Sequence, residues 1–138
     1  MTRFLMSTRG AIGLVFHALE HALGGEIFVM RMPATTLDII TDVMIELFGT
    51  PDTKRTIIGV RPGEKYSEVL VSKNEAPTTK VFDNQYYVIL PQFRSPELDK
   101  RYGNMDVINT KEFNSSNAYQ LDRHELKELL RNEKWLWN

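Results

Sequence analysis

The stretch 56-TIIGVRPGEKYSEVLVS-72 consists of two apolar runs on either side of a short polar turn. Pro62 fixes φ and Gly63 permits positive φ, so this pair predicts a tight bend. The residues around it predict one strand at 56–60 and another at 69–71. A plain turn requires neither an arginine before the proline nor an acid after the glycine.

The presence of Arg61 and Glu64 at this turn can be interpreted in two ways. An arginine fork can grip a phosphate at two points, and a carboxylate can accept hydrogen bonds from a ribose diol. Together they match the polar parts of a nucleoside diphosphate. The alternative is an exposed turn with an incidental ion pair, a common surface feature. The residues alone leave both interpretations open.

Composition limits the other possibilities. The chain has 138 residues, a length that suits one domain or a part of a larger one. Its formal net charge of −1, without a basic run, argues against a nucleic-acid partner. The absence of cysteine excludes disulfides and thiolate chemistry and suits a reducing compartment. The apolar runs are shorter than the roughly 20 residues of a membrane span, so we expect a cytoplasmic protein without membrane contact.

The periodicity of apolar residues predicts an α/β fold with about three helices, short strands and a hairpin. A helix after Ser7 should end at Gly24-Gly25, and a strand should follow at 26–30. Thr35-Thr36-Leu37-Asp38 resembles a capping box before a helix that ends near Gly49. The remaining expected elements are a strand at 69–71, a hairpin around Asp83-Asn84, and a last helix in which Asp122 and Glu125 form a capping box.

These elements predict one lobe over residues 1–138 with three parts. Residues 1–90 form the mixed α/β part, 91–121 an extended segment over the surface, and 122–138 the C-terminal helix and tail. The strands are too few for a doubly wound domain.

Other motifs point to competing chemistries. His17 and His21 have the H-x-x-E-H form of one class of zinc peptidases, but the sequence offers no clear third ligand. We therefore expect no metal site, with both histidines at the edge of an amphipathic helix. Gly10 and Gly13 form only a G-x-x-G without a preceding strand, so no dinucleotide site is expected. Neither Tyr-x-x-x-Lys nor G-x-S-x-G occurs.

Taken together with the Arg61–Glu64 turn, the whole chain resembles the C-terminal part of UDP-N-acetylglucosamine 4,6-dehydratases. These enzymes of capsule synthesis and flagellin glycosylation are extended short-chain dehydrogenase/reductases and include dehydratase/5-epimerases. The resemblance covers nearly the whole chain. It rests on these segments: 1-MTRF-4 with Met6, 18-ALE-20, 25-GEIFV-29, 33-PA-34 with Thr36, 47-LFG-49, 58-IGVRPGEK-65, 86-YY-87, 114-NS-115 with Asn117, and 121-LD-122 with 126-LKELL-130.

The resemblance implies the substrate-binding lobe of such an enzyme, without the Rossmann domain that holds NAD or NADP and the catalytic residues. Arg61 would then hold the diphosphate of a UDP-sugar and Glu64 its ribose, with Arg3 and Met6 nearer the sugar or phosphate. No catalytic or cofactor-binding residue is expected in this chain. The resemblance implies two partners, a UDP-sugar and a Rossmann-type half or partner chain. Because members of the family often form oligomers, it also implies self-association.

Two functions remain open from the sequence. One is the nucleotide-sugar-binding lobe of a dehydratase or epimerase for surface polysaccharide, which would not be catalytic alone. The other is a stand-alone, non-catalytic binding or assembly module derived from the same lobe. A split gene, a truncation and an excised domain would all explain the missing half. The sequence does not specify which UDP-sugar is bound, the C5 stereochemistry or the oligomeric state.

Overall fold

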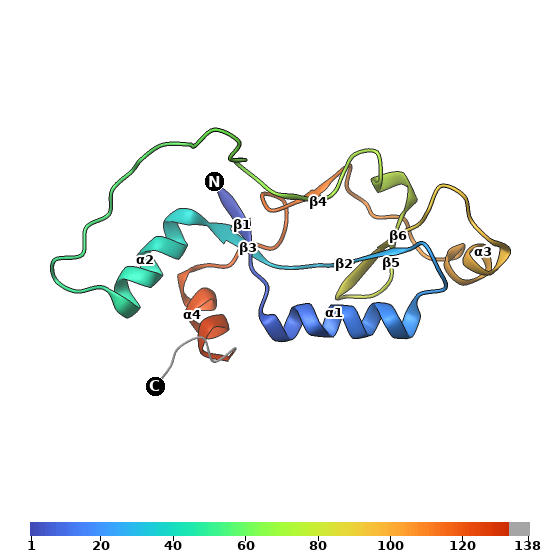
Figure 1. Cartoon of the computed structure of the whole chain (residues 1–138), viewed down its shortest axis with the longest axis horizontal. Helices are drawn as coiled ribbons and strands as arrows, with labels where there is room; N and C mark the ends of the chain where they lie inside the picture. The colour runs from blue at the N-terminus through green and yellow to red at the C-terminus, as the bar shows by residue number, and fades with distance from the viewer. Residues whose placement is uncertain (133–138) are drawn as a thin grey trace. The chain divides into compact units, whose positions relative to one another are not determined.

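The computed structural model describes residues 1–132, so the end of the expected C-terminal tail lies outside the described residues. Its elements fall into two compact units (Figure 1). Unit 1 comprises Met1–Leu5, Pro33–Glu68 and Ser115–Asn138, and unit 2 comprises Met6–Met32 and Val69–Asn114. Each unit is therefore assembled from segments that are far apart in the sequence.

Unit 1 combines a short ladder with two helices. β1 (Thr2–Phe4) pairs antiparallel with β3 (Ala34–Thr36). α2 (Leu37–Phe48) follows β3 directly, and α4 (Arg123–Asn132) packs against α2. Apolar residues at helical spacing on both helices meet at this contact. The core of the unit consists of buried Val43, Leu126 and Leu130, with partly buried Leu5, Ile39, Ile40 and Leu47.

Unit 2 is built around a three-stranded antiparallel sheet in the order β2-β6-β5. These strands are β2 (Ile27–Met30), β6 (Tyr86–Ile89) and β5 (Thr79–Val81). α1 (Thr8–His21) packs beside β2. All side chains of β6 are buried, as expected for a central strand. The core consists of Phe28, Val88, Leu90, Leu98 and Tyr102, with Leu14, Ala18, Phe82 and Met105 packed against it.

The rest of unit 2 surrounds this sheet. β4 (Val69–Val71) pairs antiparallel with β7 (Phe113–Asn114), with a shift of register between Val69 and Val71. A 3₁₀ turn, η1 (Ala76–Thr78), leads into β5. α3 (Pro96–Tyr102) follows β6 and contributes buried residues to the core.

The capping residues explain where two helices begin. Ser7 Oγ accepts the Gly10 N–H at 3.0 Å at the start of α1. At the start of α4, the Glu125 N–H donates to Asp122 at 2.8 Å, and the Asp122 N–H donates to Glu125 at 2.9 Å. Both predicted caps are thus confirmed, and the second is a reciprocal capping box.

The cap of α2 differs from the prediction by one residue. Thr36, not Thr35, is the N-cap, and its Oγ1 accepts the Ile39 N–H at 3.2 Å. Thr35 is a buried residue of β3 whose hydroxyl donates to the Leu121 carbonyl at 2.8 Å. The expected capping box with Asp38 is therefore wrong, because Thr35, which would have capped the helix, is instead paired within β3.

The hairpin around Asp83-Asn84 is confirmed, with β5 and β6 as its strands. Asp83 Oδ1 accepts the N–H groups of Gln85 and Tyr86 at 2.6 and 2.8 Å. This side chain thereby satisfies the backbone of the turn, as short polar residues commonly do.

Two predicted segments differ from the structure. Residues 56–60 were expected to form a strand, but they have no strand partner in the described chain, and Ile57 is 84% exposed. Gly59, with φ of 75°, also interrupts the extended run. Within the segment 91–121, expected to be extended over the surface, α3 instead buries Leu98 and Tyr102. Ser95 before Pro96 is the cap signal that could have predicted this helix.

Candidate functional site

The turn at Arg61–Glu64 has the predicted conformation. The Glu64 N–H donates to the Arg61 carbonyl at 3.0 Å, and Gly63 has φ of 85°. With proline in the second position and a positive φ in the third, this is a type II turn. The turn lies on the connection from α2 to β4, which Figure 1 shows in green without helix or strand.

Glu64 closes the turn through the backbone and not through an ion pair. Its Oε2 accepts the Arg61 N–H at 2.8 Å. Among residues 1–132, no carboxylate forms a salt bridge with the Arg61 guanidinium, and both side chains are exposed. The structure thus lacks the incidental ion pair, and the charged group of Arg61 faces solvent on a fixed turn.

Arg3 of β1 fixes the segment that follows the turn. Its Nη1 donates to the Lys65 carbonyl at 3.0 Å and to the Thr2 carbonyl at 2.8 Å. Its Nε lies 3.8 Å from Glu68 Oε1. The side chain is only 22% exposed. These contacts make Arg3 a positioning residue for 65–68, and its predicted contact with the sugar or phosphate stays a prediction.

A buried hydroxyl also holds residues 65–68 in place. Ser115 is fully buried, and its Oγ accepts the Glu68 N–H at 2.9 Å. The Ser115 N–H donates to the Glu68 carbonyl at 2.8 Å, and Thr2 Oγ1 lies 2.8 Å from Ser115 Oγ. The sequence analysis identified 114-NS-115 only as part of a resemblance, because no local pattern reveals a partner 47 residues away.

The beginning of the connection is attached to α2. Arg55 forms ion pairs with Asp38 and Asp42, the latter at 3.4 Å, and Arg123 of α4 also binds Asp42, at 2.7 Å. The segment 56–64 between the two attachments bears the Arg61 turn. Unit 1 therefore presents this turn on an exposed loop whose two ends are fixed to its helices and strands.

Met6, the fourth predicted site residue, belongs to unit 2, whereas Arg3, Arg61 and Glu64 belong to unit 1. It is partly buried just before the N-cap of α1. The structure thus brings Arg3 to the segment that follows the turn, and the place of Met6 in a shared site stays a prediction.

His17 and His21 lie in an aromatic cluster of unit 2. The His17 ring stacks on Tyr86 at 3.9 Å and on His21 at 4.3 Å between centroids. Phe28 and Phe82 meet the His17 ring edge-on. Burial and the neighbouring His21 hold the pKa of His17 below its ordinary value. Within the described residues, no group of three His, Asp or Glu side chains is arranged to hold a metal ion.

Gly10 and Gly13 do not form a dinucleotide-binding loop. Gly10 and Gly13 lie inside α1, so they form no loop ahead of a helix N-terminus. β1, the strand before this helix, lies in an antiparallel ladder and not in a parallel sheet. The G-x-x-G segment therefore lies within the helix predicted after Ser7, although a short strand, β1, does precede that helix.

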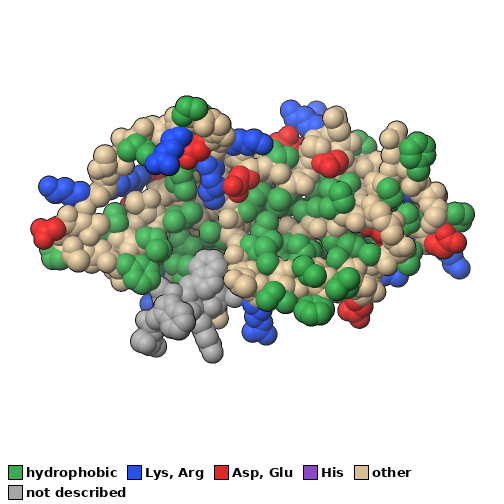
Figure 2. Space-filling view, viewed as in Figure 1, with side chains coloured by type: hydrophobic (Ala, Val, Ile, Leu, Met, Phe, Trp, Pro, Cys, Tyr) green, Lys and Arg blue, Asp and Glu red, His purple; other side chains and the backbone are tan. Residues whose placement is uncertain are grey.

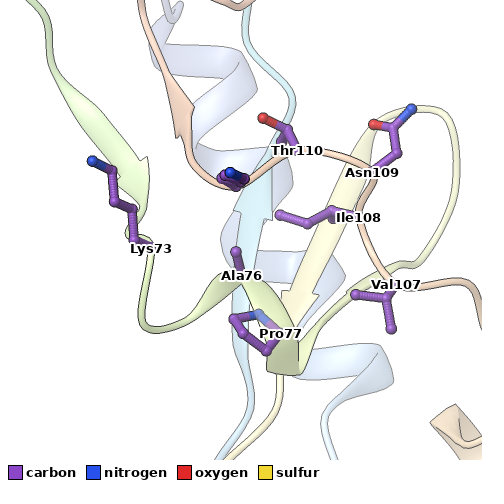
Figure 3. A pocket seen from close by; sticks show the side chains of 8 residues that line it. Lys73, Ala76, Pro77, Val107, Ile108, Asn109 and Thr110 are labelled. Atoms are coloured by element: carbon purple, nitrogen blue, oxygen red, sulfur yellow. The ribbon is translucent and has the colours of Figure 1, made fainter.

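Unit 2 also has an open pocket of about 460 Å³, separate from the Arg61 turn. Figure 3 shows Ala76 and Pro77 of η1 on one side and Val107 and Ile108 on the other. Lys73 and Lys111 also line it. Both lysines are exposed surface residues, and none of the four predicted site residues lines this pocket.

Comparison with known proteins places this chain in a family. Residues 1–90 match the family described as polysaccharide biosynthesis protein. UDP-glucose 4-epimerase of Rickettsia felis is 38% identical over 134 residues, which are 96% of this chain and 39% of that protein. The enzyme of the same name from Rickettsia typhi is 37% identical over 132 residues, with 94% and 38% covered. The chain belongs to the polysaccharide biosynthesis protein family.

The fold has a counterpart of known structure. The X-ray structure of Pen from Bacillus thuringiensis matches 99% of this chain with a TM-score of 0.79 and 27% identity, and the match covers 39% of that chain. The expected fold class, an α/β lobe of the extended short-chain dehydrogenase/reductase type, is confirmed. The chain thus spans about two fifths of the length of the proteins it matches. No helix in residues 1–132 is long and apolar enough for a bilayer span.

Proposed function

We propose that these residues form the nucleotide-sugar-binding lobe of an enzyme that modifies UDP-sugars for surface polysaccharide. The observation that supports this most directly is the exposed Arg61 guanidinium, which has no acidic partner in residues 1–132 and stands on a fixed type II turn. The names of the relatives, UDP-glucose 4-epimerase, support a UDP-sugar as the ligand class.

In this proposal Arg61 binds the diphosphate with its planar fork, which matches two phosphate oxygens. Glu64 contributes its second carboxylate oxygen to the ribose, because Oε2 already accepts the Arg61 N–H. Arg3 acts indirectly by holding the Lys65 carbonyl.

The chemistry on the sugar is assigned to a different part of the protein. Because Gly10 and Gly13 lie inside α1 and form no glycine loop, NAD or NADP and the acid–base groups would belong to the part of the relatives' length that this chain does not cover. That part would be a Rossmann-type half or partner chain, and the assembly would work in the cytoplasm. The UDP unit is shared by 4-epimerase and 4,6-dehydratase substrates, so the lobe suits either reaction.

A stand-alone, non-catalytic module derived from this lobe is the second candidate. The exposed apolar residues of the chain argue against a stand-alone module, because an independent module should bury such a surface. Co-purification of a Rossmann-type protein encoded beside this gene would favour the enzyme lobe.

The test is titration of the chain with UDP, followed by NMR shift perturbation. We expect shifts within residues 59–68 and weak binding. Arg61→Ala should weaken binding roughly ten- to hundred-fold, the effect of losing a charge-assisted contact of about 1.5–3 kcal/mol. Arg61→Lys should not restore it, because lysine lacks the fork. Glu64→Gln should cost less, since the amide oxygen still accepts hydrogen bonds.

Lys54→Ala is the matched control, because it removes a cation from the same connection without touching the turn. It should leave UDP binding unchanged. Shifts located away from residues 59–68, or an equal loss with Lys54→Ala and Arg61→Ala, would show that the turn is structural.

A further inference from the structure

The pocket of unit 2 has an apolar floor and apolar sides. Ala76 of η1 and Ile108 are buried, and the more exposed Pro77 and Val107 extend the apolar lining toward solvent. In Figure 3 the Ile108 side chain points across the pocket toward Ala76. The pocket volume of about 460 Å³ lies within the range of small-molecule sites.

Both sides of the pocket are attached to the same strand, β5. The segment that contains Ile108 runs antiparallel beside this strand. The Val81 N–H donates to the Asp106 carbonyl at 2.8 Å. The Ile108 N–H donates to the Thr79 carbonyl at 3.1 Å. On the other side, η1 leads directly into β5, and Thr79 Oγ1 donates to the Glu75 carbonyl at 2.8 Å. These hydrogen bonds fix the shape of the pocket before any ligand binds.

Two lysines without acidic partners line this apolar pocket. Lys73 and Lys111 both contribute to its lining, and within residues 1–132 neither forms a salt bridge. Glu75, the acid nearest to Lys73 in the sequence, accepts two hydrogen bonds from the third residue before it, at 2.9 and 2.5 Å. Glu112, next to Lys111, accepts the side-chain amide of Asn114 at 2.6 Å. The pocket therefore has two positive charges available to a ligand.

The combination of features distinguishes this pocket from the rest of the apolar surface. Exposed hydrophobic side chains alone do not identify a ligand site here, because they also occur elsewhere, and Figure 2 shows them gathered over α1. The pocket differs because its apolar surface is concave and lies beside unpaired cations. An apolar pocket with a few polar groups is typical of sites for small organic molecules.

We propose that this pocket binds a small amphipathic anion, a phosphate or carboxylate attached to an apolar body. The apolar body would lie against Ile108 and Val107, and Lys73 and Lys111 would hold the anion. A lysine suits this role because its flexible stem carries a compact charge. The Asn109 amide, which has no side-chain hydrogen bond within residues 1–132, can donate to the same anion. The site is separate from the Arg61 turn and does not depend on the proposed function.

The experiment is an NMR titration of the chain with four probes that separate charge from apolar surface. Phenyl phosphate and 3-phenylpropionate have both parts and differ in the anion. Inorganic phosphate lacks the apolar body, and benzyl alcohol lacks the charge. We expect at least one of the two amphipathic anions to shift the amides of residues 73–78 and 107–111, with a dissociation constant of roughly 1 mM. Inorganic phosphate and benzyl alcohol should each bind about tenfold more weakly or less, and salt should weaken the binding of the anions.

Substitutions in the lining identify the groups that bind. Lys73→Ala and Lys111→Ala should each weaken binding roughly three- to fivefold, as expected for exposed charges, and the double variant about tenfold or more. Val107→Asp should prevent detectable binding, because it adds a negative charge to the apolar side of the pocket. Lys100→Ala is the matched control, since it removes an exposed lysine of unit 2 that lies outside the pocket. Its binding should equal that of the wild type.

The proposal is overturned if neither amphipathic anion shifts the pocket amides, or if inorganic phosphate binds as tightly as both of them. Equal losses with Lys100→Ala and the pocket lysine variants would also overturn it, because binding would then reflect only surface charge. Tighter binding of phenyl phosphate or of 3-phenylpropionate identifies the anion as a phosphate or a carboxylate. UDP titration tests the proposed function separately, because its shifts are expected within residues 59–68. If the amphipathic anions instead shift only residues 59–68, the pocket is not their site.

Discussion

Ser115 shows how a single residue can fix a loop that the sequence leaves undetermined. Its hydroxyl is fully buried and accepts the Glu68 N–H, while its backbone N–H donates to the Glu68 carbonyl. Glu68 in turn accepts the Phe4 N–H through its carboxylate at 3.3 Å. The end of the connection that bears the Arg61 turn is therefore held by two other segments of unit 1, one with Phe4 and one with Ser115.

Ser115→Ala should destabilise this attachment. The substitution leaves the Glu68 N–H without its partner, at a cost of roughly 1–3 kcal/mol in the free energy of unfolding. Urea denaturation of the two proteins measures this cost. Ser67→Ala, which removes a hydroxyl one residue before Glu68, is the control and should have little effect. Equal stability of the Ser115 and Ser67 variants would contradict the role assigned to the buried hydroxyl.

His17 should make the protein sensitive to acid. Its Nε2 is buried without a hydrogen-bond partner in the described residues, and its pKa is lowered by burial and by His21, against the opposing effects of Asp83 and Glu20. A lowered pKa in the folded state means that the unfolded chain binds the proton first as pH falls. The stabilising effect is therefore complete above about pH 6.5 and is lost as pH falls through the folded-state pKa.

His17→Phe should reduce the loss of stability between pH 7.5 and 5.5, because phenylalanine keeps the stacked ring but binds no proton. His124→Gln, at an exposed position of α4, is the matched control and should keep the wild-type pH dependence. Urea midpoints at both pH values provide the comparison. The assignment fails if His17→Phe and wild type lose the same stability on acidification.

At the scale of elements, the contact of α2 with α4 decides whether unit 1 has a core. Leu126 is 2% exposed, and it meets fully buried Val43 across the contact. Charged residues flank these apolar positions, with Lys127 paired to Glu46 and Arg123 to Asp42. Such exposed pairs contribute little, so the buried leucines and valine provide most of the stability.

Leu126→Ala should destabilise the protein by about 2–5 kcal/mol, the usual cost of a cavity at a buried leucine. Leu129→Ala in the same helix is the matched control, since Leu129 is only partly buried and the helix propensities are identical. Thermal unfolding of both variants distinguishes the positions. A larger loss for Leu129 than for Leu126 would contradict the packing described for unit 1.

At the scale of the whole molecule, the chain corresponds to about two fifths of its relatives and consists of two units assembled from distant segments. Phe16 and Leu19 of α1 are more than half exposed, whereas Phe4 and Met6 are partly buried. A lobe of this kind should bind part of a substrate but perform no chemistry alone.

The purified chain should accordingly neither bind NAD or NADP nor convert UDP-glucose or UDP-N-acetylglucosamine. Gly10 and Gly13 lie inside α1, where the helix offers no loop to surround a pyrophosphate. Isothermal calorimetry with NAD and NADP is the direct measurement, with UDP as the positive control. Micromolar affinity for either dinucleotide would overturn this assignment of roles.

Much of the fold was predictable because its signals are local. Ser7, the Asp122–Glu125 capping box, the hairpin at Asp83 and the turn at Pro62-Gly63 each depend on contacts within a few residues. Residues 56–60 have the apolar composition of a strand, but a strand also needs a neighbour for its backbone hydrogen bonds, and the described residues provide none. α3 was missed although Ser95 and Pro96 give a recognisable helix start.

The sequence by itself determined the α/β class, most helices and strands, and the conformation of the Arg61–Glu64 turn, because each follows from short-range sterics and hydrogen bonding. Only the tertiary structure decided that Arg3 holds the Lys65 carbonyl, that Ser115 fixes Glu68 and that Thr2 meets Ser115. These contacts join positions 62, 47 and 113 residues apart. Their partners are set by how β1, β3 and the following segments pack, which no local pattern specifies.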